Sequence, residues 1–448
     1  MAQSITTKIV NLTAQVVSAP VPSQLQQSGA LISVGGTTLT TGLYQYCGDL
    51  PTVVSYLQTS GTGNYAELLH MATTFFAQGT GVGMYLLELG YDANIATQIT
   101  SLETWITANP GVFYSYLVPV DWDSMSEIVG SVTIGTGTYT YTVAPTVTFT
   151  AASGGGVTAT ATATIDSNGL VTAITITNPG WYPNQTAPTA TLSVASTGTA
   201  PTLTVVMANA LNVMAKNYSS ATGKTYFFVD TTTSGMTAYA TNKAIFSLVT
   251  SPTAPSTEFS VAFPFYQWLV NNPRAASPLA PMGFRYGYGI TPWSPTGNEG
   301  TLTNILTNYT NVVYTGAEGG ISTSCLFRGM LQDGTQASWW YGIDWFQIQV
   351  KQALAAAIIN GSNSNPPLLY NQNGINTLQK IAQNIANSAV TFGCALSATV
   401  TAQSFVDYTT QNPNDYAAGI YDGFSATVVG QNGFQSITFK LSAVQFVV

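Results

Sequence analysis

The pattern of hydrophobic and polar residues changes character twice along this chain of 448 residues. Within residues 23–127, short apolar runs such as 84–89 alternate with stretches at 65–76 and 94–108 whose apolar residues recur at helical spacing. Continuous apolar runs are typical of strands buried in a parallel sheet, and the stretches between them fit crossover helices. This first part therefore predicts an α/β fold with a twisted sheet.

A different pattern fills residues 128–208, where Thr, Ala, Val, Gly, Ser and Pro predominate. Polar and small apolar residues alternate strictly at 158–165, the period of a half-buried strand, and 166–169 (Asp-Ser-Asn-Gly) has turn composition. The segments 145–149 and 188–192 resemble one unit used twice. We predict a small all-β domain inserted into the α/β body.

Helical and buried-strand patterns resume in residues 209–340. The expected elements are helix 210–217, strand 224–230, helix 238–244, strand 244–249, helix 259–271, an irregular stretch at 277–300, helix 303–308 and strand 311–314. Residues 341–430 then predict two amphipathic helices, at 344–360 and 374–390, followed by closing strands.

Both ends of the chain have the composition of strands. Residues 1–22 carry spaced aliphatic residues and end at Pro20 and Pro22, and residues 431–448 alternate apolar and polar side chains up to the final valine. A strand at a chain end leaves a row of unpaired backbone N–H and C=O groups that can pair with another strand. The two ends therefore suggest a subunit that pairs with its neighbours.

Charge excludes several classes of function. Only 6% of residues are charged, net charge is −8, and 10 Lys and Arg residues cannot form a basic patch, so we expect no nucleic-acid binding.

No apolar stretch reaches the roughly 20 residues of a membrane span. The three cysteines fit neither a zinc site nor a disulfide framework, which favours buried free thiols and a reducing site of synthesis. Such a weakly charged surface favours a protein that works inside an assembly.

Candidate catalytic chemistry is sparse. The single histidine, His70, lies in a predicted apolar helix, and nothing in its context pairs it with Cys47. Asp121, Asp123 and Glu127 follow a predicted parallel strand, where α/β folds place ligand sites, and paired carboxylates can hydrolyse glycosides. A solvated loop with a helix cap is the alternative interpretation. Glu88 is a second carboxylate, but it lies inside a predicted strand.

Two further patterns weigh against a ligand site. The glycine clusters at 79–83 and 154–156 lack the spacing and the lysine of a phosphate-binding loop. Trp339, Trp340 and Trp345 would form a binding shelf only if exposed, and core packing is the alternative.

The order of features resembles the tail sheath proteins of contractile-tailed bacteriophages, especially the short sheath type. The matching stretches are 43–50, 65–76, 85–90, 314–329, 342–345, 373–375 and 415–419. No single motif is diagnostic, and the resemblance lies in their order over most of residues 23–127 and 209–448. The insert at 128–208 departs from that pattern and resembles β modules that decorate phage structural proteins.

The resemblance implies a sheath-type α/β core with N- and C-terminal β-strand arms. Subunits would form stacked hexameric rings around a tail tube through strand addition, and would contract to drive the tube through the host envelope. The implied partners are further copies, the tube protein, and baseplate and tail terminator proteins, in a virion made in the host cytoplasm. No enzyme activity, metal or cofactor is expected.

The same resemblance assigns roles to residues at the two ends. The expected strand-donating residues are Ile5, Ile9, Leu12, Val16, Phe439, Leu441, Phe446 and Val447, and the expected hinge residues are Ala19, Pro20, Pro22, Gly430 and Gly433. The alternatives are another virion structural protein, such as a baseplate, capsid or fibre component, and a glycan-binding or glycan-hydrolysing protein.

Overall fold

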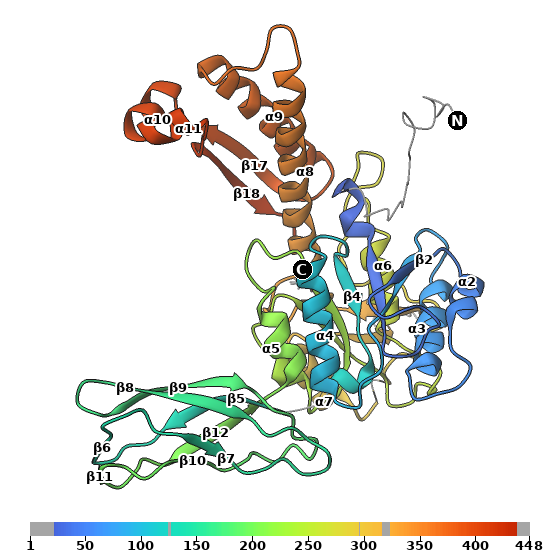
Figure 1. The fold of residues 1–448 in the computed structure, drawn as a ribbon. Helices are drawn as coiled ribbons and strands as arrows, with labels where there is room; N and C mark the ends of the chain where they lie inside the picture. Colours follow the sequence, from blue (N-terminus) through green and yellow to red (C-terminus); the bar gives the residue numbers. More distant parts are fainter. Residues whose placement is uncertain (1–21, 124–126, 295, 316–322, 437–448) are drawn as a thin grey trace, which may run out of the picture.

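The computed structural model describes residues 22–123, 127–294, 296–315 and 323–436. Figure 1 shows an α/β body in the middle, a C-terminal lobe on one side of it and the strands of the insert on the other. The body is built on a six-stranded sheet of order β14-β13-β4-β1-β3-β2, in which only β2 runs antiparallel to its neighbour. Its strands are β1 (Gly29–Ser33), β2 (Tyr44–Cys47), β3 (Met84–Glu88), β4 (Ser115–Leu117), β13 (Tyr226–Thr231) and β14 (Ile245–Val249).

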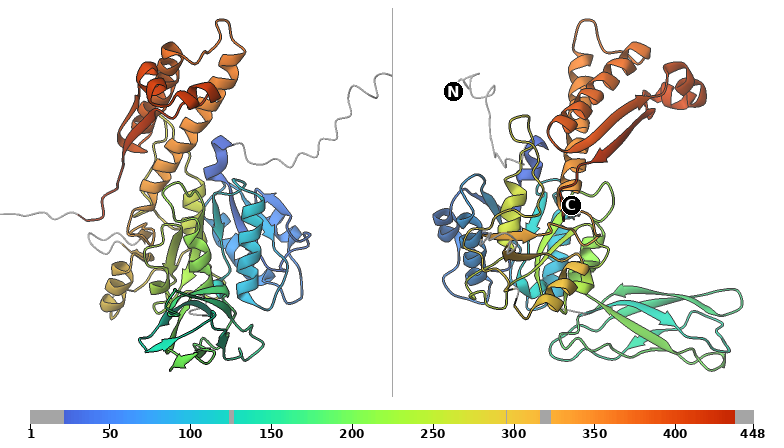
Figure 2. Two further views of the ribbon diagram at one scale, coloured as in Figure 1. Left: turned by 60° about the vertical axis from the view of Figure 1, so that its left-hand side comes forward. Right: turned by 180° about the vertical axis from the view of Figure 1, so that it is seen from behind.

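Helices cover both faces of this sheet, which gives the body two hydrophobic cores (Figure 2). One face packs against α2 (Leu50–Tyr56), α3 (Tyr65–Ala77) and α6 (Ala262–Leu269), and the other against α4 (Ile95–Ala108) and α5 (Ala210–Lys216). The coverage explains why the strands are continuously apolar, since both sides of each strand are buried. The sheet order and the helices on both faces confirm the predicted α/β class.

The remaining elements of the body are short. They are η1 (Pro22–Gln27), η2 (Val120–Asp123), η3 (Met236–Tyr239), α7 (Glu299–Thr307), β15 (Val312–Thr315) and β16 (Ser324–Phe327).

Three expected elements of the body are clearly shorter than the sequence pattern indicates. Of the helix expected at 259–271, α6 covers only Ala262–Leu269. The parallel strand predicted just before Asp121, over residues 112–120, is formed as β4 only from Ser115 to Leu117. Pro119, which has no N–H to donate, lies beyond its end. The helix expected at 238–244 is only the single 3-10 turn η3, which stops before Thr241. Thr241 has φ of 65°, a left-handed conformation that ends a helix.

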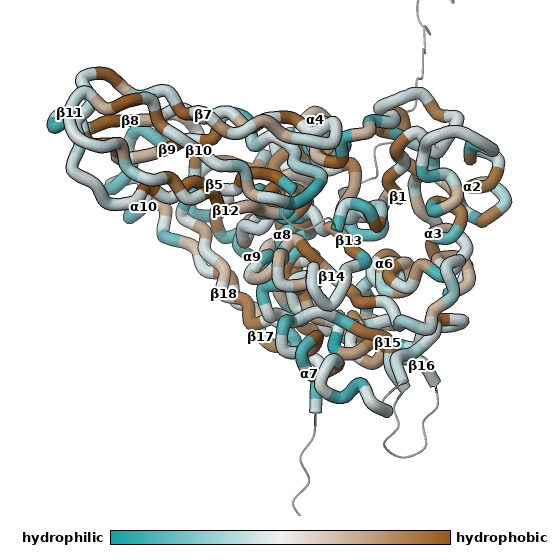
Figure 3. The backbone as a smooth tube through the Cα atoms, turned by 90° about the horizontal axis from the view of Figure 1, so that it is seen from below, coloured by the Kyte–Doolittle hydropathy of each residue, from teal (hydrophilic) through white to brown (hydrophobic). Residues whose placement is uncertain are grey.

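The insert consists of strands alone within its described residues. They are β5 (Ile128–Ile134), β6 (Tyr139–Thr140), β7 (Val147–Phe149), β8 (Thr160–Ile165), β9 (Val171–Asn178), β10 (Ala190–Leu192), β11 (Thr197–Gly198) and β12 (Leu203–Ala208). Ile128 and Ala208 lie opposite each other in the antiparallel β5–β12 pair, so the insert leaves and re-enters the body at one place. Figure 3 shows its strands running out to one side, with hydrophobic and hydrophilic residues interspersed along them.

The C-terminal lobe is carried by the long helix α8 (Ala337–Ser362). The lobe adds α9 (Gln372–Thr391), β17 (Ala395–Ala402), α10 (Phe405–Gln411), α11 (Pro413–Ala418) and β18 (Phe424–Gly430). The first turns of α8 are buried in the body and its later turns lie in the lobe, so the boundary expected between residues 340 and 341 falls inside this helix. None of the described helices is long and apolar enough to cross a membrane.

Candidate functional site

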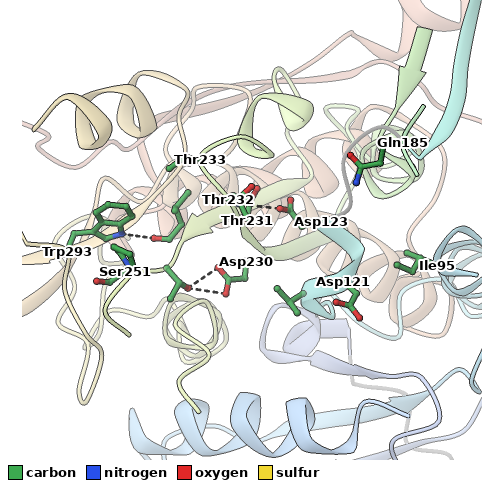
Figure 4. Close-up of a pocket in the computed structure, with 14 residues that line it drawn as sticks. Ile95, Asp121, Asp123, Gln185, Asp230, Thr231, Thr232, Thr233, Ser251 and Trp293 are labelled. Carbon is green, nitrogen blue, oxygen red and sulfur yellow. Dashed lines mark hydrogen bonds between the residues drawn. The ribbon is translucent and has the colours of Figure 1, made fainter. Parts of the chain in front are cut away.

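A crevice opens at the carboxyl ends of the central strands. The sequence predicts the carboxylate candidates Asp121 and Asp123 at this end of the sheet. Two adjoining cavities of about 650 and 540 Å³ share Ile95, Val120, Asp121 and Asp230 in their walls. The crevice lies where β1 connects to β3 on one side and β4 leads on toward β13 on the other, the position at which α/β sheets bind ligands. Figure 4 shows Asp121, Asp123 and Asp230 around the larger cavity.

The carboxylates in this crevice accept hydrogen bonds from neighbouring elements. Asp123 of η2 accepts from the Tyr239 hydroxyl at 2.8 Å and from the backbone N–H of Thr232 at 3.2 Å. Asp230, in β13, accepts from the Thr250 hydroxyl at 2.9 and 3.0 Å. These contacts connect η2, β13 and η3 with the end of β14.

A third acid, Glu67 of α3, lines the smaller cavity together with His70. It accepts from the backbone N–H of Val120 at 2.7 Å, which joins α3 to η2. Burial raises the pKa of Glu67 to about 7, and the nearby carboxylates of Asp121 and Asp230 add to the shift. Glu67 is therefore partly protonated at neutral pH.

Two more acids in the crevice are shifted in the same direction. Burial raises the pKa of Asp230 to about 7 and that of Asp123 to about 6, and the hydrogen bonds that each accepts oppose the shift. Raised carboxyl pKa values also mark catalytic acids, but structural burial produces them equally well.

The three acids that the sequence grouped as a catalytic candidate do not come together. Asp121 and Asp123 line the crevice, whereas Glu127 accepts a hydrogen bond from the indole N–H of Trp181 at 3.1 Å, at the base of the insert. No cluster of His, Cys, Asp and Glu that could hold a metal ion occurs in the described part of the chain. Asp123 and Glu127 thus each accept hydrogen bonds that join neighbouring elements.

The other polar candidates are also structural. Glu88, at the end of β3, accepts bonds from the hydroxyls of Ser33 and Thr37 and from the backbone N–H groups of Gly35, Thr37 and Gly90. This carboxylate therefore holds the β1 and β3 ends together. Burial raises the pKa of the Cys47 and Cys394 thiols to about 12, so both stay protonated and unreactive.

The tryptophans expected to pack or to form a shelf are engaged in the fold. Trp345 is buried in the core of the lobe. The indole N–H of Trp340 donates to Asp333 at 3.0 Å, and the Lys243 ammonium lies 3.9 Å from its ring centroid. These contacts favour the core-packing interpretation over a binding shelf.

A second candidate surface is the two-stranded sheet of the C-terminal lobe. β17 and β18 pair antiparallel, and one face of the pair packs against α8 and α9. The outer edge of β17 is closed by α9, because Gln383 accepts from the N–H of Val400 at 2.8 Å and Gln379 donates to the Val400 carbonyl at 3.2 Å. Two glutamine side chains thus make the hydrogen bonds to Val400 that a third strand would otherwise make.

The outer edge of β18 is open. Val400 lies opposite Ala426. In an antiparallel pair, the backbone N–H and C=O groups of two opposed residues either bond each other or both point away from the partner strand. Since the backbone groups of Val400 bond the glutamines, those of exposed Ala426 point outward from β18. Within the described residues no third strand pairs with this edge, which is therefore a template for an added strand.

Most of the predicted arm residues lie outside the described part of the chain. These are Ile5, Ile9, Leu12, Val16, Ala19, Pro20, Phe439, Leu441, Phe446 and Val447. Of the remaining hinge candidates, Pro22 begins η1, Gly430 ends β18, and Gly433 is bonded through its N–H and its carbonyl to the side chain of Gln336. Their role as hinges stays a prediction.

Sequence reasoning missed both the closed and the open edge of the lobe sheet, because neither is visible without knowing which helix packs on β17. It also missed Glu67 and Asp230 as members of the acidic crevice. The position of Asp230 could have revealed it, since it ends a predicted buried strand and Asp121 directly follows another.

Comparison with known proteins identifies the architecture. No protein-family model and no curated protein matches the chain. Among solved structures, the helical sheath of the anti-feeding prophage in its contracted state matches with a TM-score of 0.52 and 10% identity, over 97% of this chain and 99% of that one. The chain has a contractile-sheath fold.

Two further structures accompany this match. A chain of the anti-feeding prophage baseplate aligns with a TM-score of 0.54 and 8% identity, over 94% of each chain. The sheath tail protein Lin1278 of Listeria innocua aligns with a TM-score of 0.39 and 11% identity, a score that adds nothing to the argument. The sheath fold thus covers the body and the C-terminal lobe together.

Proposed function

We propose that this protein is the structural subunit of a contractile tail sheath, in a phage tail or a related particle. The observation that carries the proposal is the likeness to a helical sheath subunit over nearly the full length of both chains. Subunits would stack as hexameric rings around a tube, with baseplate and terminator proteins at the two ends. Contraction would then be a repacking of the same subunits that needs no cofactor.

The open edge of β18 supports this function because it provides an acceptor for strand addition. The terminal segments 1–21 and 437–448 have strand composition, and one of them from a neighbouring copy would pair with the outward backbone groups of Ala426. Repeating that head-to-tail contact with a screw rotation generates an open helical array. The 6% of charged residues lowers the desolvation cost of such contacts.

The substitution Ala426→Pro tests strand addition directly. Proline removes the outward N–H of β18 and leaves the ladder to β17 intact, and edge strands tolerate proline at such positions. We expect a folded, soluble subunit whose free energy of unfolding changes by less than about 1 kcal/mol, and which forms no cylinders by negative-stain electron microscopy.

Ala426→Ser is the matched control, because it keeps the N–H and should assemble like the unmodified chain. Cylinders of normal length from Ala426→Pro would overturn the acceptor role of β18. If the unmodified chain itself forms no cylinders under any condition tried, the sheath function is contradicted.

A second candidate function is that of a baseplate component. It is favoured by the TM-score of 0.54 to a chain of the anti-feeding prophage baseplate. Short closed rings in place of extended cylinders, from the same purified chain, would support the baseplate role.

A further inference from the structure

The described ends of the chain both meet one short stretch of α8. Near the N-terminus, the side chain of Gln26 in η1 is 6% exposed and donates to the carbonyl of Tyr341 at 2.9 Å. Near the C-terminus, Gln336 accepts from the N–H of Gly433 at 2.8 Å and donates to its carbonyl at 2.9 Å. Gln26 and Gly433, which lie near the two described ends, therefore both bond residues within 336–341.

Close packing reinforces the C-terminal contact. A Cβ atom added to Gly430 would lie 2.3 Å from the indole nitrogen of Trp339, so the backbone of β18 at this point rests directly on the first turn of α8. Only glycine allows this approach.

The first turns of α8 are in turn fixed to the sheet. Asp344 is fully buried and accepts from the hydroxyls of Tyr114 at 2.8 Å and Tyr226 at 2.7 Å, which lie at the start of β4 and β13. The Tyr114 hydroxyl also lies 3.4 Å from the Gln26 amide nitrogen. One hydrogen-bond network thus joins η1, α8 and the central sheet.

We propose that residues 336–344, at the start of α8, are a shared anchor that couples the two ends of the chain, so that loosening one end loosens the other. The inference rests on the proposed function, in which these ends carry the strands exchanged between subunits. A helix transmits displacement because it is stiff, and coupling between two sites is reciprocal. A pull on one arm during ring repacking is therefore passed through α8 to the other arm of the same subunit.

Amide hydrogen exchange on the full chain, at a concentration too low for assembly, tests the coupling. Gln336→Met removes the clamp on Gly433 at constant side-chain length, and the readout is the Ser28 amide, which bonds the Leu25 carbonyl in η1. Gln26→Met removes the other clamp, and the readout is the Gly433 amide. We expect the distant amide to exchange about 5-fold faster or more in each variant.

Gln431→Met is the matched control, because this exposed glutamine bonds only the neighbouring carbonyl of Asn432 and should change neither amide. Gln336→Glu keeps the acceptor for Gly433 and removes the donor, so a smaller change of the same sign is expected at Ser28. This milder variant keeps the test valid if Gln336→Met does not fold.

If each substitution speeds exchange only at its own end, the ends are independent and the shared anchor is wrong, whether or not the subunit assembles. Coupled exchange in a chain that never forms cylinders would leave the anchor standing and contradict the sheath function. The two proposals can therefore fail separately.

Discussion

At the scale of single residues, ionising the acids of the crevice is less favourable in the folded body than in the unfolded chain. Glu67, Asp123 and Asp230 are brought to one crevice from α3, η2 and β13, and partial or full burial raises the pKa of each. A carboxyl whose pKa is higher in the folded than in the unfolded chain binds its proton more tightly after folding. The folded body is therefore more stable when these carboxyl groups are protonated than when they are ionised.

The free energy of unfolding should fall as pH rises from about 4 to about 7. The stabilisation from Glu67 is complete below its unfolded pKa of about 4 and is lost as pH rises through the folded pKa of about 7. Glu67→Gln keeps an oxygen for the Val120 N–H and removes the titration, so the pH dependence should shrink by on the order of 1–2 kcal/mol. Urea unfolding at several pH values measures it.

The control for this experiment is Glu299→Gln, which changes an exposed carboxylate of α7. It should leave the pH dependence of unfolding as it is in the unmodified chain. Equal pH profiles for Glu67→Gln and the unmodified chain would contradict the raised pKa of Glu67.

At the scale of elements, α8 determines how the lobe is attached. The helix has 26 residues and is about 39 Å long, so one rigid element serves the core of the body and the core of the lobe. Gly342 packs closely against the residue that precedes β17, since an added Cβ would lie 2.5 Å from the carbonyl oxygen of Cys394. The backbone cannot yield there without moving the β17 strand.

Gly342→Ala should therefore destabilise the protein by about 1–3 kcal/mol, through overpacking between α8 and β17. Gly300→Ala in α7 is the matched control, since nothing lies within 4 Å of its Cβ position and alanine favours the helix by up to about 1 kcal/mol. Chemical denaturation of both variants makes the comparison. A Gly342→Ala protein as stable as the control would show that α8 and β17 can separate freely.

The sequence predicts an element well where the burial of that element follows one pattern along its whole length. The amphipathic α9 and the apolar strands β3 and β14 follow directly from their patterns, because their surroundings are uniform along their length. The start of α8 at Ala337 was missed because its first turns are buried on all sides and so lack an amphipathic period. The acceptor edge of β18 depends on contacts of β17 with α9, which no local pattern encodes.

At the scale of the whole molecule, the insert is a separable part. It has its own hydrophobic cores and is joined to the body where Ile128 and Ala208 lie opposite each other. Since the strands enter and leave side by side, we expect that the insert can be removed without pulling the body apart.

Replacing residues 130–206 by an Asn-Gly turn between Val129 and Met207, which are opposed in the β5–β12 pair, should leave the body folded. We expect the free energy of unfolding of the body to change by less than about 2 kcal/mol, and assembly to remain normal by electron microscopy. The loss of cylinders with an intact body would show instead that the insert contributes contacts between subunits.

In the proposed sheath, the open edge of the lobe sheet also has a consequence for the polymer as a whole. Because α9 closes β17, the described lobe sheet would offer one acceptor edge per copy, and a chain of such contacts would have two unlike tips. At one tip the last acceptors would stay empty, and at the other the last donors would have nowhere to bind. Growth would thereby be directional, and the finished length would be decided by whatever protein occupies the unfilled edges of the terminal layer.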